Sequence, residues 1–342
     1  MRVVAALADL AQSGPLFESR WRITLPDSPS APAAYDPTRA YIPLRDGTLM
    51  AIALADGRTL WTVDAPTTLR PAAGDMLLFV AGEKEIRALH VADGREQWRA
   101  AMDNPNVALL FDTGWLFVGT ANGSLVALRA SDGELLWKLD MGTPLSALPA
   151  PSGQSIYLPL SDGRLMAADL QTGQALWTRK LAGAPAEILA LDDRLFVGSN
   201  DNYFYCISAK DGGIRWRWRT GGDIVAPAVV DEARVYFMSL DNVLRALDLY
   251  NGSQRWQRPL ANRTMGGPLR SGSLIVVAAL APQLQAYQRI DGKPAGTSPV
   301  PEGDELSSTL AAPPHRVSLD GHDAFVLLTR QGVMQFFGLP TS

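Results

Sequence analysis

Residues 163–177 read GRLMAADLQTGQALW, an apolar strand pattern followed by a turn at Gly173 and, four residues later, Trp177. The same glycine-to-tryptophan spacing occurs six times in the chain: Gly57/Trp61, Gly94/Trp98, Gly133/Trp137, Gly173/Trp177, Gly212/Trp216 and Gly252/Trp256. Successive tryptophans are 37, 39, 40, 39 and 40 residues apart. A fixed period of about forty residues indicates one supersecondary unit that is copied around a ring or along a rod.

One complete repeat, residues 223–259, shows what this unit is. Apolar or alternating runs at 224–230, 235–238, 243–248 and 255–258 are separated by turn residues such as Asp241-Asn242 and Asn251-Gly252. Runs of this length with turn signals between them predict four antiparallel strands. Four antiparallel strands in each repeat are typical of a propeller blade.

The third predicted strand of each repeat carries a small residue six positions before the turn glycine. These residues are Ala51, Ala88, Ala127, Ala167, Cys206, Ala246 and Ala286. A small side chain at a fixed position predicts close approach to a neighbouring blade. Cys206 therefore reads as a buried packing residue in an alanine position, and a reactive thiol is the alternative.

The register predicts an all-β, eight-bladed propeller of four-stranded antiparallel blades. The expected blades are residues 30–64, 67–102, 105–141, 145–180, 184–219, 223–259, 263–299 and 307–340. The seventh has Gly296 in place of the tryptophan, and the eighth ends before a fourth strand. Residues 16–25 supply that strand, because Trp21 lies 40 residues before Trp61. We expect an N-terminal extension, 1–15, and a single propeller domain, 16–342.

The repeats resemble the quinoprotein-type (PQQ-like) propeller family, in which Ala-Leu-Asp precedes a turn glycine and a tryptophan. Residues 163–177 are among the best copies, with Ala-Ala-Asp at 167–169. The resemblance implies that the tryptophans dock each blade onto the next. They are Trp21, Trp61, Trp98, Trp137, Trp177, Trp216 and Trp256. A ring of tryptophans could also stack a planar ligand, but the structural role is the simpler hypothesis.

Charge and apolar runs limit the classes of partner and the cellular compartments that we expect for this protein. A net charge of −4 and a pI near 5.5 are unlike those of nucleic-acid-binding proteins. The apolar run after Met1 stops at Asp9, which is too early for a signal peptide, and no stretch has the length of a membrane helix. We expect a monomeric propeller without a transmembrane segment. It is periplasmic or outer-membrane-associated if a leader has been removed, and otherwise cytoplasmic.

Catalytic patterns are missing from the repeats. Resemblance to the quinone-dependent dehydrogenases of this repeat type would imply a bound calcium ion, an aspartate that acts as base and often two adjacent cysteines. This chain has only one cysteine. Asp112, Asp192, Asp193 and Asp231 occupy turn positions, and His90, His315 and His322 lie far apart in sequence. We therefore predict no enzyme, no cofactor and no catalytic or metal-binding residue. A PQQ-dependent dehydrogenase-like or small-ligand-binding propeller stays as the alternative.

Residues 215–219 read Arg-Trp-Arg-Trp-Arg, an unusual alternation for an outer strand. Period-two spacing places the three arginines on one side and the two tryptophans on the other. A charged edge that opposes edge-to-edge pairing is one interpretation. A partner surface of Arg215, Arg217, Trp218 and Arg219 is the other, since Arg and Trp are common at interface hot spots.

Within the PQQ-like family, the eight blades and the N-terminal closing strand resemble the BamB family, propeller lipoproteins of the bacterial outer-membrane barrel-assembly machine. This implies a scaffold with a protein partner in such a complex. That family has a Leu-x-Leu-Arg-Gly contact segment after its third blade, whereas residues 145–149 read LSALP. The contact residues are therefore not carried over. Any binding site is expected on the face where the loop tips gather, namely Asp46, Glu83, Asn122, Asp162, Asp201, Asp241 and Arg330, and the other interpretation of each is an ordinary turn residue.

Overall fold

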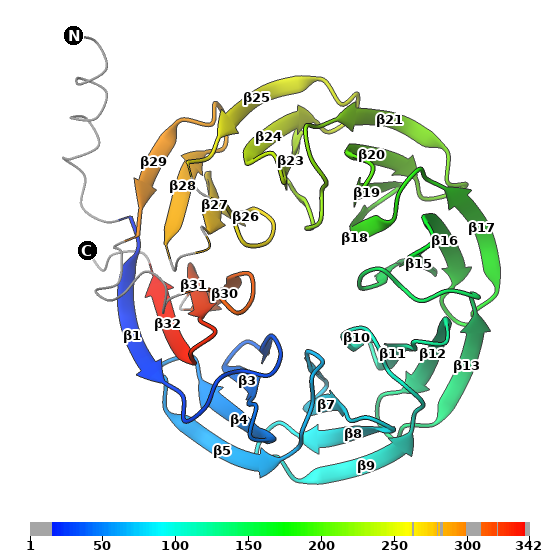
Figure 1. Ribbon diagram of the computed structural model, residues 1–342, viewed down its shortest axis with the longest axis vertical. Helices are drawn as coiled ribbons and strands as arrows, with labels where there is room; N and C mark the ends of the chain where they lie inside the picture. The colour runs from blue at the N-terminus through cyan, green and yellow to red at the C-terminus, as the bar shows by residue number, and fades with distance from the viewer. Residues whose placement is uncertain are drawn as a thin grey trace.

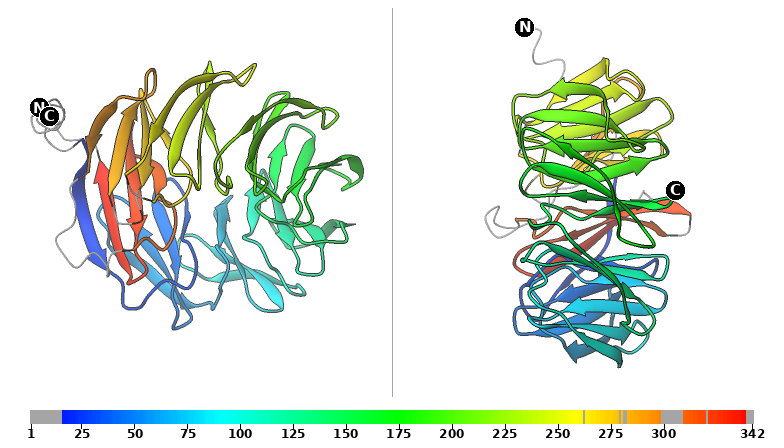
Figure 2. Two further views of the ribbon diagram at one scale, coloured as in Figure 1. Left: turned by 45° about the horizontal axis from the view of Figure 1, so that its top comes forward. Right: turned by 90° about the vertical axis from the view of Figure 1, so that its right-hand side faces the viewer.

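Eight four-stranded antiparallel sheets form a closed ring around a central opening (Figure 1). The computed structural model describes residues 16–261, 263–278, 280, 283–298, 309–319 and 321–338, and the predicted extension 1–15 lies outside them. These residues contain strands and turns but no helix, and hence no helix that could span a membrane. The predicted eight-bladed propeller is confirmed. Figure 2 shows the twist of the sheets from the side.

The strands of each blade follow one another from the channel outward. The first and second blades are β2 (Ala34–Tyr35), β3 (Arg39–Pro43), β4 (Thr48–Ala53), β5 (Thr59–Asp64) and β6 (Ala72–Gly74), β7 (Leu77–Ala81), β8 (Glu85–His90), β9 (Glu96–Ala101). The third and fourth are β10 (Leu110–Asp112), β11 (Trp115–Gly119), β12 (Ser124–Arg129), β13 (Leu135–Asp140) and β14 (Ala150–Ser152), β15 (Ser155–Pro159), β16 (Arg164–Asp169), β17 (Ala175–Lys180).

The fifth and sixth blades are β18 (Pro185–Leu191), β19 (Arg194–Ser199), β20 (Tyr203–Ser208), β21 (Ile214–Arg219) and β22 (Val229–Val230), β23 (Arg234–Ser239), β24 (Val243–Asp248), β25 (Gln254–Pro259). The seventh and eighth are β26 (Leu269–Ser271), β27 (Leu274–Ala278), β28 (Leu284–Gln288), β29 (Pro294–Thr297) and β30 (His315–Leu319), β31 (His322–Leu328), β32 (Val333–Gly338), β1 (Glu18–Thr24).

The predicted first strand of the sixth blade, 224–230, is too long. Only Val229–Val230 pair as β22. Ile224 donates its backbone N–H to Ser199 O and packs in the apolar layer against the fifth blade. Pro227 has no N–H to give to a ladder. The start of this run therefore belongs to the junction between blades.

The core lies between the blades, as apolar layers that neighbouring sheets share. In the layer between the fifth and sixth blades, the rings of Phe204 and Phe237 stack with centroids 4.0 Å apart. The small third-strand residues are at most 1% exposed, and in six blades each pairs with the tryptophan of the outer strand. Close packing at these positions explains the repeated alanine.

Each outer-strand tryptophan reaches across to the next blade. Its indole N–H donates a hydrogen bond to a backbone carbonyl of the next blade, three residues before the turn glycine of that blade. These bonds are Trp21 to Leu54, Trp61 to Val91, Trp98 to Ala130, Trp137 to Leu170, Trp177 to Ala209 and Trp256 to Arg289, at 2.9–3.0 Å. The ring also covers that glycine, so that a Cβ on Gly133 would lie 2.7 Å from Trp98. A glycine and a tryptophan that lie four residues apart therefore contact different blades. Gly133 is covered by Trp98 of the preceding blade, whereas Trp137 reaches Leu170 of the following blade.

One junction departs from this pattern. The Nε1 atom of Trp216 is buried and has no hydrogen-bond partner among the described residues. The carbonyl that it would use, Leu249 O, accepts from Nη1 of Arg194 at 3.4 Å. The guanidinium of Arg194 also lies 4.5 Å from the ring centre of Tyr250. Arg194 therefore occupies the place of the indole donor.

The N-terminal segment closes the ring across two junctions. β1 pairs antiparallel with β32, and Trp21 stacks on Phe336 at 5.4 Å. Just before β1, the fully buried Phe17 packs edge-on against Phe325 at 5.1 Å, next to the seventh blade that lacks a tryptophan. Leu16 covers Gly296, the residue in the tryptophan position. Closure by this strand leaves the last blade with a complete sheet.

Replacing Trp177 by Phe should destabilise the protein by about 1 kcal/mol more than replacing Trp216 by Phe. Both changes remove similar ring area, but only Trp177 loses a hydrogen bond, to Ala209 O. Trp216→Phe instead removes an unpaired buried donor. Urea unfolding of both variants and the parent measures the difference, and equal losses would contradict the assigned bonding.

Gly133→Ala should cost more stability than Gly153→Ala. Both glycines have positive φ, 76° and 60°. An alanine in that conformation costs about 1 kcal/mol. Only at Gly133 does the added Cβ meet an indole, because nothing lies within 4 Å of the corresponding point at Gly153. We expect a further loss of about 1–3 kcal/mol from overpacking at Gly133. Thermal unfolding of the two variants side by side tests this steric contribution.

Candidate functional site

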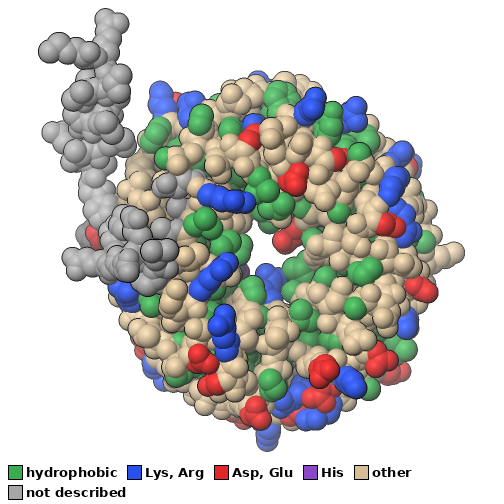
Figure 3. Space-filling view, in the orientation of Figure 1, with side chains coloured by type: hydrophobic (Ala, Val, Ile, Leu, Met, Phe, Trp, Pro, Cys, Tyr) green, Lys and Arg blue, Asp and Glu red, His purple; other side chains and the backbone are tan. Residues whose placement is uncertain are grey.

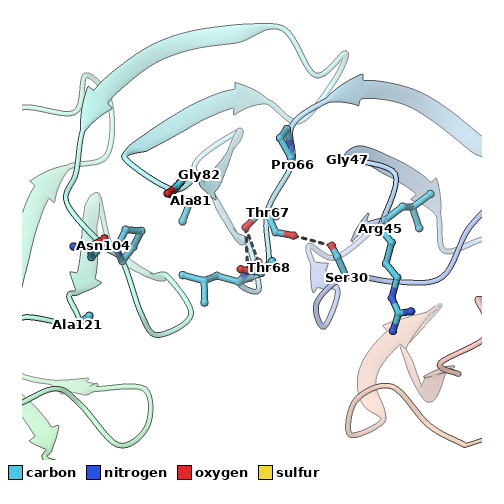
Figure 4. A pocket seen from close by; sticks show the side chains of 14 residues that line it. Ser30, Arg45, Gly47, Pro66, Thr67, Thr68, Ala81, Gly82, Asn104 and Ala121 are labelled. Carbon is cyan, nitrogen blue, oxygen red and sulfur yellow. Dashed lines mark hydrogen bonds between the residues drawn. The ribbon is translucent and has the colours of Figure 1, made fainter.

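A groove of about 640 Å³ opens across the first three blades, on the face that carries the turns between second and third strands (Figure 4). Its walls come from the turns β3–β4 and β7–β8 and from the connections β5–β6 and β9–β10. The lining residues are Ser30, Leu44, Arg45, Gly47, Pro66, Thr67, Thr68, Leu69, Ala81, Gly82, Glu83, Asn104, Pro105 and Ala121. Small and polar groups dominate this lining.

The floor of the groove is fixed by hydrogen bonds. Thr67 is 7% exposed, and its hydroxyl donates to Leu69 O and accepts from Leu69 N, both at 3.1 Å. The Ser30 hydroxyl donates to Thr67 O at 2.7 Å, which ties the first blade to the connection that leads into the second (Figure 4). The floor is thus preformed, and binding here needs little ordering of the protein.

Two charged side chains of the groove remain available. In the β3–β4 turn, Asp46 accepts from Thr48 N at 2.8 Å, while Arg45 extends into the open space (Figure 4). Within the described ranges, neither Arg45 nor Glu83 makes a side-chain hydrogen bond or ion pair. The groove therefore presents one cation and one anion, on the turns of neighbouring blades, to an incoming molecule.

Most of the predicted loop tips are used by their own turns. Asp46, Asp162, Asp201 and Asp241 each accept from the backbone N–H two residues later. Asp241 also pairs with Arg245 at 2.6 Å. Burial alone would raise the pKa of Asp241, but hydrogen bonds from Arg245 and Ser239 to its carboxylate lower that pKa to about 2. Glu83 lines the groove, and Asn122 lines a separate hollow of about 290 Å³. Arg330 is exposed.

Sequence reasoning missed the other groove residues. Arg45, Thr67 and Thr68 carry no repeat signature and follow no known motif. Only the ring brings three consecutive blades close enough for their connections to share a wall. The one signal in the sequence near the groove is a glutamate at position 83, where five of the other repeats have aspartate or asparagine.

The Arg-Trp alternation forms β21, an outer strand. Arg215, Arg217 and Arg219 are exposed, whereas Trp216 and Trp218 are half-buried. Arg215 pairs with Asp193 at 2.5 Å, and the guanidinium of Arg217 lies 4.8 Å from the ring centre of Tyr203. This strand lies on the outer wall of the fifth blade, away from the groove (Figure 1).

A second group of titratable residues gathers near the central channel. On the innermost strands β2 and β30, the rings of Tyr35 and His315 stack at 3.9 Å. Enclosure, and to a smaller extent the charge of Arg70, lowers the pKa of His315 to about 4, so its imidazole is neutral at pH 7. Enclosure raises the pKa of Glu187, and Arg70 opposes that rise. No sequence pattern places His315 beside Tyr35.

The lining of the groove offers hydroxyl groups, the Glu83 carboxylate and the Arg45 guanidinium as polar groups. Across the part of the chain that the structure describes, no group of three or more His, Cys, Asp or Glu side chains could hold a metal ion.

The sequence model of the family described as "Outer membrane protein assembly factor BamB" matches residues 18–113, 45–189 and 185–339. The chain belongs to the BamB family. BamB of Yersinia pestis is 23% identical over 316 residues, which cover 82% of this chain and 79% of that protein.

Solved structures share the fold. BamB from Moraxella catarrhalis superposes with a TM-score of 0.77 at 16% identity, over 95% of this chain and 98% of that chain. The quinohemoprotein alcohol dehydrogenase from Comamonas testosteroni has a TM-score of 0.74 at 12% identity, over 96% and 78%. At these identities the likeness speaks for the fold alone.

Cys206 should not react with thiol reagents in the native protein. It is fully buried, and burial raises the pKa of its thiol to about 11. The thiolate, which is the reactive form, is therefore scarce as well as shielded. Ellman's reagent at pH 8 should detect no thiol before unfolding and one thiol in urea. Stoichiometric modification of the native protein would restore the alternative of a reactive cysteine.

Proposed function

We propose that this propeller is a non-enzymatic scaffold in outer-membrane protein assembly and that it holds a partner polypeptide in the groove of blades one to three. The observation that carries the proposal is the BamB-family match, which extends from residue 18 to residue 339 and thus takes in all eight blades. In this proposal the partner of the propeller is a protein of an outer-membrane assembly complex. The propeller itself lies in the periplasm or at the inner side of the outer membrane.

The groove suits a polypeptide in several ways. Gly47, Gly82 and Ala121 line it with little side-chain bulk, so that a backbone can approach. Arg45 and Glu83 are available for opposite charges on the partner. Charged pairs of this kind contribute specificity and orientation.

The connection before the fourth blade supports the choice of the groove. At residues 145–149, Leu145 is only 4% exposed and Ser146 donates to Pro185 O at 2.5 Å. These side chains already serve the protein's own packing. A partner therefore finds more unused polar groups in the groove than on this connection.

Thr68→Trp should fill the groove and weaken partner capture. Thr68 is exposed in the lining, and an indole there would occupy the space of the bound segment. Thr62→Trp on the outer face of β5 is the matched control, because Thr62 is also exposed but lies outside the lining. After co-purification from solubilised native envelopes, quantitative mass spectrometry should show about tenfold less assembly protein with Thr68→Trp only. Equal recovery with both variants would exclude the groove.

Titration with PQQ and Ca²⁺ separates the scaffold from the dehydrogenase-like alternative. We expect no stoichiometric uptake of the quinone and no dye-linked oxidation of alcohols or sugars. Tight uptake together with turnover would overturn the proposal.

A further inference from the structure

The outer wall of the fourth, fifth and sixth blades is strongly basic. Its three outer strands, β17, β21 and β25, contain seven cationic residues and no Asp or Glu. They are Arg179, Lys180, Arg215, Arg217, Arg219, Arg255 and Arg258. Since the whole chain has a net charge of −4, all other residues together carry −11. We call these three strands the basic belt, and Figure 3 shows Lys and Arg side chains along this part of the rim.

Carboxylates offset only part of this charge. Arg215 pairs with Asp193 and Arg255 with Asp248, each at 2.5 Å. Arg179 and Arg258 donate to the backbone carbonyl groups of neighbouring turns, at 2.6–2.7 Å. The carboxylates of Asp211 and Asp291 on these turns interact electrostatically with them. Within the described residues, Arg217 and Arg219 of β21 form no ion pair, so the positive field that can attract an acidic partner is centred on this strand.

The central strand of the belt is an open edge. β21 is the last strand in its sheet, after β18, β19 and β20, so its outward backbone groups have no partner strand. Its exposed arginines recur at every second residue, about 6.6 Å apart. Like charges directly opposite each other are destabilising, so the row opposes pairing with a second copy of this strand. A strand with acidic residues at the same spacing would meet opposite charges instead.

We propose that the basic belt binds an extended, acidic segment of a partner protein, which lies along β21 with its acidic side chains at alternate positions. The half-buried Tyr203 ring beneath Arg217 gives the arginine side of this strand aromatic area. Trp218 lies on the opposite side of the strand, against the apolar layer that the fifth and sixth blades share. Aromatic and arginine side chains together are typical of interface hot spots. The belt is a second surface, on the outer wall, and does not depend on the groove.

A labelled peptide of four Glu-Thr repeats provides a direct probe. Fluorescence anisotropy should show binding to the parent protein that weakens as salt rises. The double variant Arg217→Glu/Arg219→Glu should bind about tenfold more weakly. Arg58→Glu/Arg95→Glu, at exposed turns of the first two blades, makes the same change in net charge and should bind like the parent. Thermal unfolding verifies that both variants are folded.

Two further measurements make the outcome decisive. A peptide of four Lys-Thr repeats should bind the Arg217→Glu/Arg219→Glu variant better than the parent, because the charge pattern is then reversed. Equal weakening in both double variants would reduce the effect to net charge and overturn the proposal. So would belt-dependent binding to phosphatidylglycerol vesicles without binding to the acidic peptide, because the occupant would then be a membrane surface.

Discussion

The contact between an indole and a glycine of the next blade is the constraint on which the ring depends. The tryptophan covers a glycine with positive φ, and its N–H binds the carbonyl three residues earlier. The turn must therefore carry glycine for two reasons, its backbone conformation and the absence of room for a Cβ. Repeated around the ring, the contact sets the spacing between sheets and leaves little freedom for one blade alone.

This architecture explains why most polar groups of the chain are committed to the fold itself. The strands are committed to the shared apolar layers, and the turn aspartates bind their own backbone N–H groups. Function is left to groups that the architecture does not use. Within the described residues, Arg45 and Glu83 in the groove and Arg217 and Arg219 of β21 are groups that form no ion pair, whereas Arg215 pairs with Asp193. The roles that we propose for both surfaces are binding roles, in keeping with a family described as assembly factors.

The two irregular junctions show how the same constraint is met by other means. Where the seventh blade lacks a tryptophan, Phe17 and Leu16 from the N-terminal segment fill the space. Where Arg194 binds the carbonyl of Leu249, the indole N–H of Trp216 has no partner among the described residues. In both cases a side chain from outside the repeat pattern replaces one contact while the packing persists.

The eight blades, the N-terminal closing strand and the burial of Cys206 could all be predicted from the sequence, because a forty-residue period reports contacts that recur in every copy. Where the polar groups of different repeats meet could not be predicted in this way. The groove at Arg45 and Glu83, the pairing of Tyr35 with His315 and the exchange at Arg194 each join residues from different repeats. Only ring closure and the twist of the sheets bring such residues together, since their positions depend on the radius of the whole ring and not on any local pattern.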